Sequence, residues 1–276
     1  MKIKLLLLIS IFFIPVISIY AQKQAVRIIP AGSYFNSIAT DTKDLATAPF
    51  KWDQKNWLKA GAITAAGVGL YFADPCIQKF SQRNKTTFTN NSSKNLLEPF
   101  GHGYYPAAIV GGFYMYAQIY KNERASHFAL TTAKAAIING AITYAVKHLA
   151  HRQRPFQGIE ANHTKWDGPL GDFGQTSFIS GHTVIAWTFA TAISTEYSEY
   201  KWVPWLSYSM ATLAGLSRIH DNKHWASDVF MGAAFAWFST KFIFQKNKNT
   251  QSVMTKSSPI VTMDYGYTQY GFLLRF

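Results

Sequence analysis

Six apolar segments without a charged side chain dominate the middle of this chain and constrain its fold more than any other feature. Segments of this length, bounded by polar residues, are typical of buried helices rather than strands. They cover residues 60–73, 106–120, 135–146, 184–195, 202–217 and 229–240. The pattern predicts an all-α protein, a single helical bundle of about six core helices, with a short C-terminal β-hairpin or strand.

The composition supports a packed bundle and excludes cysteine chemistry. Of the 276 residues, 48% are hydrophobic, enough to bury a large core. One cysteine, Cys76, leaves no partner for an intrachain disulfide and no cysteine-based metal motif. We expect Cys76 to be a small core filler, and we expect most tryptophans, including Trp205 and Trp225, to fill the core.

The ends of the chain differ from its middle. Residues 1–21 combine an early Lys2 and Lys4 with an uncharged run from Leu5 to Tyr20, which predicts a signal peptide and export; an uncleaved anchor is the alternative. We expect residues 22–55 to be an extended lead-in with a short helix near residues 37–43, and 56–248 to be the helical domain. Residues 249–276 form a tail with strand-like alternation, expected to pack on the bundle.

The lengths of the apolar segments and the position of Lys134 bear on whether the chain spans a membrane. Each apolar segment falls short of the about 20 residues that span a bilayer comfortably. Lys134 interrupts the third helical stretch, where a lysine facing lipid is costly. We therefore predict a water-facing bundle with some membrane association, and keep an integral membrane protein as the alternative.

The net charge of +13 predicts a surface that attracts anions. Lysines and arginines are scattered singly and in pairs, without the basic runs of nucleic-acid-binding tails. We expect no nucleic-acid partner. Phosphates and acidic lipid headgroups remain candidate ligands.

The first of three polar clusters follows the third apolar segment. Lys147 and Arg154 are seven residues apart, which would place both cations on one helix face, and Pro155 would end that helix. Taken alone, these cations are also explained by the negative end of a helix dipole.

The second cluster is Ser180, Gly181 and His182, directly before an apolar segment. A helix beginning here presents free backbone N–H groups to an anion, and Gly181 allows close approach. Capping of the helix by the Ser180 hydroxyl is the plainer explanation.

The third cluster contains Arg218, His224 and Asp228. A spacing of four places His224 and Asp228 on one helical face, where Asp228 would accept the Nδ1 proton and leave Nε2 free as a nucleophile. A charged helix start is the alternative.

In order, these clusters resemble the K-x6-R-P, P-S-G-H and S-R-x5-H-x3-D motifs of the type 2 phosphatidic acid phosphatase and vanadium haloperoxidase superfamily. The resemblance covers roughly residues 56–244. One departure is Ile179, which stands where the family has proline and cannot fix φ as proline does.

The resemblance implies a role for each matching residue. Phosphate oxygens would be held by Lys147, Arg154, Ser180, Gly181 and Arg218. His224 would attack phosphorus, Asp228 would orient the ring, and His182 would protonate the leaving oxygen. No metal or other cofactor is implied.

The function predicted is a metal-independent phosphatase acting through a phosphohistidine on a phosphorylated small molecule or lipid, outside the cytoplasm. A soluble acid-phosphatase-like enzyme, a vanadium haloperoxidase and a non-catalytic lipid-phosphate binder are the alternatives. The sequence does not distinguish among lipid phosphates.

Overall fold

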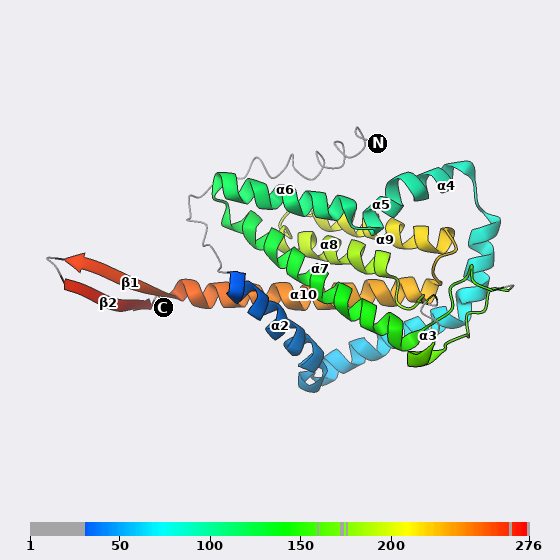
Figure 1. Cartoon of the computed structure of the whole chain (residues 1–276), viewed down its shortest axis with the longest axis horizontal. Helices are drawn as coiled ribbons and strands as arrows, with labels where there is room; N and C mark the ends of the chain where they lie inside the picture. The colour runs from blue at the N-terminus through cyan, green and yellow to red at the C-terminus, as the bar shows by residue number, and fades with distance from the viewer. Residues whose placement is uncertain (1–30, 159, 172–173, 175, 265–266, 275–276) are drawn as a thin grey trace.

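The computed structural model describes residues 31–158, 160–171, 174, 176–264 and 267–274, and it is predominantly helical (Figure 1). The predicted signal peptide lies outside these residues. Each of the six apolar segments lies within one long helix, which confirms the all-α bundle. These helices are α3 (Gln54–Arg83), α6 (Tyr104–Tyr120), α7 (Glu123–Ala150), α8 (Gly181–Glu196), α9 (Trp202–His220) and α10 (Ala226–Lys256).

The helix count is higher than predicted because polar segments also form helices. Within the described part of the expected lead-in, the short helix predicted near residues 37–43 is present but longer, as α2 (Ala31–Thr47), and η1 (Ala48–Lys51) follows it where extended chain was expected. Thr86 begins another helix with a capping box, in which its hydroxyl and that of Thr89 each accept a backbone N–H. The remaining short elements are α4 (Thr87–Ser92), η2 (Ser93–Leu97), α5 (Glu98–Gly101) and η3 (Gly168–Leu170).

The central helix of the bundle is α8, which packs against α7, α9 and α10. Its residues are mostly small or apolar, so three neighbours approach it closely. Edge-to-face aromatic pairs extend the core, with ring centroids 4.7 Å apart for Phe113 and Phe128 and 5.9 Å apart for Phe100 and Phe189. This packing fixes the first turn of α8, which carries the second polar cluster.

Lys134 explains why α2 docks on the bundle. Its ammonium is buried and donates to Asp41 of α2 over 2.8 Å and to Asn247 of α10 over 2.7 Å. The lysine therefore faces a carboxylate inside the protein. A buried charge that finds its partner on another helix holds the two helices together.

The helix α3 is the most exposed of the long helices. By length and composition it is the one helix among the described residues that could cross a membrane, and 11% of its apolar window is buried. The uncharged run at residues 60–73 is short, as expected, but α3 extends beyond it at both ends and is therefore long enough to reach across a bilayer. Cys76 on α3 is exposed, so its prediction as core filler is wrong as well.

The prediction that tryptophans fill the core is right for one of the two named tryptophans and wrong for the other. Trp225 is 1% exposed and confirms it, whereas Trp205 on α9 is 79% exposed and contradicts it. Trp205 belongs to a group of large apolar side chains that face outward from α6 and α9: Tyr114, Met115, Ile119, Tyr120, Trp202, Leu213 and Leu216.

The chain ends in two antiparallel strands, β1 (Ser257–Asp264) and β2 (Tyr267–Leu274), with Ser257 opposite Leu274. Figure 1 shows this pair extending from the end of α10 away from the helices. The side chains of this tail lie outside the description, so its predicted packing on the bundle stays a prediction.

Replacing Asp41 by asparagine should destabilise the fold. The change leaves the Lys134 ammonium buried without a counter-charge, which costs about 3 kcal/mol and lowers Tm by about 10 °C. Thermal unfolding followed by circular dichroism measures the shift. The double variant Asp41→Leu/Lys134→Met removes both charges and should recover most of the loss; equal Tm values for Asp41→Asn and the wild type would contradict this role.

Candidate active site

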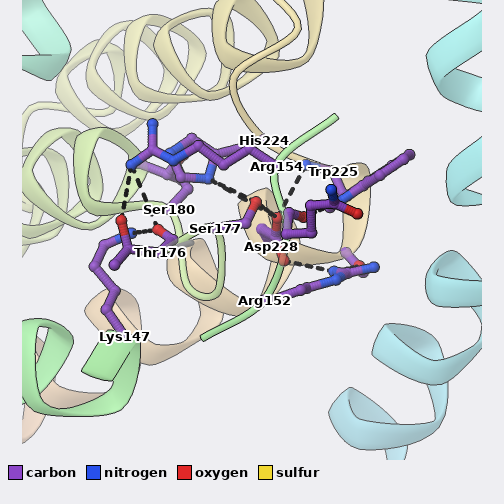
Figure 2. A network of polar contacts seen from close by, with 12 residues as sticks. Lys147, Arg152, Arg154, Thr176, Ser177, Ser180, His224, Trp225 and Asp228 are labelled. Carbon is purple, nitrogen blue, oxygen red and sulfur yellow. Dashed lines mark hydrogen bonds and ion pairs between the residues drawn. The ribbon is translucent and has the colours of Figure 1, made fainter. Parts of the chain in front are cut away.

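The three polar clusters meet at one end of the bundle, where α7 ends and where α8 and α10 begin. Figure 2 shows Lys147 and Arg154 directed at Thr176, with His224, Ser177 and Asp228 beside them. All the residues predicted for the site are among the described ones. The structure brings them together, but Arg154 and His224 lie in loops and not on the helix faces that the spacing predicted.

Lys147 and Arg154 converge on Thr176 from different elements. Lys147 Nζ donates to the Thr176 carbonyl over 2.5 Å, and Arg154 Nη2 donates to the Thr176 hydroxyl over 3.2 Å. The prediction that one helix face carries both cations is wrong. The helix α7 ends at Ala150, because His151 adopts a left-handed conformation with φ 41°, and Arg154 lies in the following loop.

Ser180 and Gly181 form the N-terminus of α8 as predicted. Within the described residues the Ser180 side chain makes no capping hydrogen bond; its Oγ instead accepts from Thr183 Oγ1 over 2.9 Å. Capping therefore does not explain this serine. A Cβ at Gly232 of α10 would lie 3.0 Å from the Ser180 carbonyl oxygen, so the glycine allows α10 to pack directly against this turn.

His224 and Asp228 are close but not on one helical face. His224 precedes α10, which begins at Ala226, and its Nδ1 lies 3.8 Å from Asp228 Oδ2, too far for a hydrogen bond. The Ser177 hydroxyl bridges them, 3.5 Å from His224 Nδ1 and donating to Asp228 Oδ2 over 2.5 Å. Nε2, the other ring nitrogen, is the one available to a substrate.

Asp228 is fully buried and accepts hydrogen bonds from several directions. Arg152 Nη1 donates to its Oδ1 over 2.5 Å, and the Trp225 backbone N–H donates to its Oδ2 over 3.0 Å. The second contact is a helix cap, so the charged helix start considered from the sequence is also present. The imidazole of His224 and the charge of Arg152 outweigh burial and hold the pKa of Asp228 below its ordinary value.

Arg218 is buried near the end of α9 with two carboxylates on its guanidinium. Nη1 lies 3.2 Å from Glu98 Oε1, and Nη2 donates to Asp221 Oδ2 over 2.6 Å. Ser93 donates to the same Asp221 carboxylate over 2.8 Å, which joins the short η2 segment to the site. The segment between α3 and α6 therefore supplies Glu98 as a direct partner of Arg218 and Ser93 as a partner of Asp221.

His182 lies in the first turn of α8, where α5 passes close to it. A Cβ at Gly101 would stand 2.9 Å from the His182 ring, so glycine is needed at this crossing. The His102 ring lies edge-on to the His182 ring with centroids 4.2 Å apart. Burial, and next the charge of Arg218, lower the pKa of His182 to about 3.

Burial, together with the positive charge of the site, changes the titration of its bases. Burial lowers the pKa of His224 to about 4, and Lys147 and Arg154 add to the effect while Asp228 opposes it. Burial and the charge of Arg154 lower the pKa of Lys147 to about 7. At neutral pH, His224 is therefore an uncharged imidazole facing cations, which is the form that acts as a nucleophile.

Glu98, His102 and His182 also place one ligand atom each within 4.8 Å of one another. Two imidazoles and a carboxylate are a set that zinc accepts. However, the guanidinium of Arg218 lies against Glu98, and its charge opposes a cation at this place.

Four residues that contact the site were not singled out from the sequence: Asp74, Arg152, Thr176 and Ser177. Arg152 and Ser177 lie inside the polar clusters, but no spacing argument separates them from their neighbours. Asp74 lies 153 positions before Ser227, which it contacts, and no local pattern indicates that pairing.

Taken together, the fold and the site define a helical bundle that brings the half-buried Lys147 and Arg154 and the buried Arg218 to the end that carries His224 and Asp228, which is an anion-binding arrangement. The sequence profile of the PAP2 superfamily matches residues 125–252, the segment that contains all three clusters. Residues 125–252 therefore match the PAP2 superfamily, and the resemblance stated from the motifs is confirmed.

Two known proteins add to this comparison. The chain is 48% identical to a lipid A 1-phosphatase of Porphyromonas gingivalis over 59 residues, which are 21% of this chain and 13% of that protein. The alignment thus spans about an eighth of the relative. A crystal structure of a transmembrane PAP2 type phosphatidylglycerolphosphate phosphatase from Bacillus subtilis matches with a TM-score of 0.49 and 17% identity, over 68% of this chain and 95% of that one.

Anion affinity should depend on the charge of Lys147. Below a pH of about 7 the ammonium is protonated and adds a charge-assisted contact; above it, the contact is lost. We expect sulfate, whose own charge is constant over this range, to bind about tenfold more weakly at pH 9 than at pH 6. Isothermal titration calorimetry of the purified protein measures this dependence.

Lys147→Arg is the matched control for sulfate binding. Arginine stays protonated throughout the range, so its affinity should be nearly constant with pH. A pH dependence that is the same in Lys147→Arg and in the wild type would assign the titration to another group.

Proposed function

We propose that the protein is a metal-independent phosphatase that hydrolyses lipid phosphates through a phosphohistidine. The observation that carries the proposal is the arrangement of an uncharged, buried His224 opposite Lys147 and Arg154, with the Asp228 carboxylate behind its Nδ1 side. Such a site attracts an anion and holds a nucleophile against it. The PAP2-superfamily match over these same residues supports the assignment.

In the proposed first step, Nε2 of His224 forms a bond to phosphorus while the bond from phosphorus to the ester oxygen breaks. The departing oxygen takes a proton from His182. Lys147, Arg154 and Arg218, with Ser180 and the Gly181 N–H, hold the other phosphate oxygens and stabilise their charge. A dianionic phosphate among these groups raises the proton affinity of His182, which makes it an acid in the complex.

In the second step, water attacks phosphorus and the bond to His224 breaks. His182, now neutral, accepts the proton of the water, and inorganic phosphate leaves. Asp228 stabilises the positive imidazole ring in both steps, partly through Ser177. The scheme uses the residues of this chain throughout.

A lipid substrate is favoured by the surface near the site. Tyr104, Phe156 and Trp166 are exposed at its border, and Tyr104 stacks on His102, which contacts His182. The exposed apolar side chains of α3, α6 and α9 fit a membrane-associated protein. The lipid A 1-phosphatase relative is consistent with this substrate class. We place the enzyme outside the cytoplasm because of the signal peptide predicted at residues 1–21.

The decisive assay is phosphate release in EDTA by the purified protein and by His224→Ala. The wild type should release phosphate, and the variant should lose at least about a thousandfold in rate because the nucleophile is absent. His220→Ala is the matched control, since His220 is partly exposed, bonds to Asn90 over 2.9 Å and should retain full activity. Acid-labile phosphate on the wild type, trapped by rapid quenching, identifies the phosphohistidine.

Substrate class is tested with a panel in mixed detergent micelles. Lipid phosphates should be hydrolysed with a kcat/KM at least about tenfold above that of p-nitrophenyl phosphate, because the apolar border contributes binding energy. The reverse order would indicate a soluble acid-phosphatase-like enzyme. Absence of release from every member by a folded protein would overturn the phosphatase proposal, and vanadate-dependent halide oxidation would then test the haloperoxidase alternative.

A further inference from the structure

A buried ion-pair chain extends from the site into α3, outside the segment matched by the PAP2 profile. Arg152 is fully buried, and its guanidinium lies between two carboxylates that are also fully buried. Nη1 donates to Asp228 over 2.5 Å, and Nη2 donates to Asp74 over 2.7 Å. Asp74 thus reaches the catalytic carboxylate through one intervening side chain.

The remaining polar groups of this chain are also paired. Asp74 accepts from the Ser227 backbone N–H over 2.9 Å and from the Ser227 hydroxyl over 2.5 Å. Arg152 also donates to the His163 carbonyl, and its guanidinium lies 4.9 Å from the centroid of the Trp166 ring. A buried guanidinium with this many partners is held in one orientation.

The burial pattern of α3 singles out Asp74. Among the thirty residues of this helix, the buried ones are Gly67 and Asp74. Most apolar side chains of α3 are exposed, so hydrophobic burial does not explain why Asp74 is buried against the bundle. Asp74 is placed there by its contacts with Arg152 and Ser227.

Two further side chains of α3 hold the loop that carries His224. Gln78 Nε2 donates to Asn222 Oδ1 over 2.8 Å, and Gln82 Nε2 donates to the Ile219 carbonyl over 3.2 Å. Asn222 adopts φ 61°, a left-handed conformation that asparagine tolerates well. Together with the contact of Asp74 to Ser227, these bonds connect α3 to residues before and after His224.

The balance of charge gives Asp74 a specific effect on His224. Asp74 and Asp228 each carry a negative charge and Arg152 carries one positive charge, so the three groups together are negative by one. If Asp74 were neutral, Arg152 would pair with Asp228 alone and the two would cancel. Asp74 therefore leaves the charge of Asp228 effective at His224, where a positive ring must be stabilised.

We propose that Asp74 and Arg152 are positioning residues of the phosphatase, through which α3 orients Asp228 and maintains its negative charge toward His224. The inference rests on the proposed function and extends it to a helix outside the matched domain. Both residues act through Asp228, and neither contacts the reacting phosphate.

The test compares Asp74→Asn with Asp74→Asn/Arg152→Gln. The single variant removes one negative charge, so kcat should fall about tenfold with KM within about twofold, because one tenfold loss corresponds to 1.36 kcal/mol of transition-state stabilisation. The double variant restores the net charge of minus one and should recover most of the lost kcat. A purely structural role predicts that the second change adds to the loss, and that outcome would overturn the proposal.

Asp41→Asn is the matched control, since it neutralises a carboxylate of another buried ion pair, between α2 and α7. It should lower Tm and leave the kcat of the folded protein unchanged. Circular dichroism of each variant normalises the rates to folded protein. If Asp74→Asn fails to fold, the charge-balanced double variant still decides: a kcat near that of the wild type supports the proposal, and a loss greater than tenfold overturns it.

A second readout does not depend on catalysis. The protonation of His224 is followed by NMR of protein labelled with ¹⁵N-histidine, with His224→Gln used for assignment. Lys147, Arg154, Asp228 and Ser177 face or neighbour this ring, and their charges are the same in all variants. Asp74→Asn should lower the proton affinity of His224 about tenfold, and the double variant should restore it. An unchanged proton affinity would overturn the proposal, even in a protein that releases no phosphate from any substrate.

Discussion

The carboxylate of Asp228 accepts hydrogen bonds from three separate parts of the chain, and the site is assembled around it. Arg152 follows α7, Ser177 precedes α8, and the Trp225 N–H precedes α10. A buried charge is costly unless donors surround it, so each loop is stable in its observed path only when the others are in place. The same requirement that stabilises this end of the bundle also determines where His224 stands.

On the opposite side of the site, two cations have partners that a phosphate can replace. Lys147 and Arg154 donate to the carbonyl and hydroxyl of Thr176, whereas Arg218 is paired with the carboxylates of Glu98 and Asp221. Carbonyl and hydroxyl oxygens bind a buried cation less strongly than a phosphate oxygen does. The donors are thus held in position before a ligand arrives, and little reorganisation is needed when it binds.

The sequence predicted the bundle, and which residues come together at one end of it, more accurately than their local geometry. Uncharged segments indicate helices directly, so the six long helices were predictable, although α3 is largely exposed instead of buried in the core. The helix α2 depends on the pairing of Asp41 with Lys134, 93 positions apart. The spacing of motifs identified Lys147, Arg154, His224 and Asp228, but the assumption of continuous helices was wrong for Arg154 and His224. A left-handed residue at His151 and the start of α10 at Ala226 separate these side chains from the helices. Asp74 contacts the site only through tertiary structure, and a single sequence carries no signal for it.

The length of α3 gives its polar contacts a mechanical meaning. Thirty residues of helix extend about 45 Å, and Asp74 lies about 30 Å from the beginning. The long N-terminal part of α3, before Asp74, is mostly exposed. The shorter C-terminal part contacts the residues around His224. A tilt of about five degrees about the far end would move Asp74 by roughly 2.6 Å at this length, comparable to the length of its hydrogen bond to Arg152. A contact that tilts the exposed N-terminal part of α3 would for this reason also change the geometry of the buried Asp74 and Asp228 carboxylates.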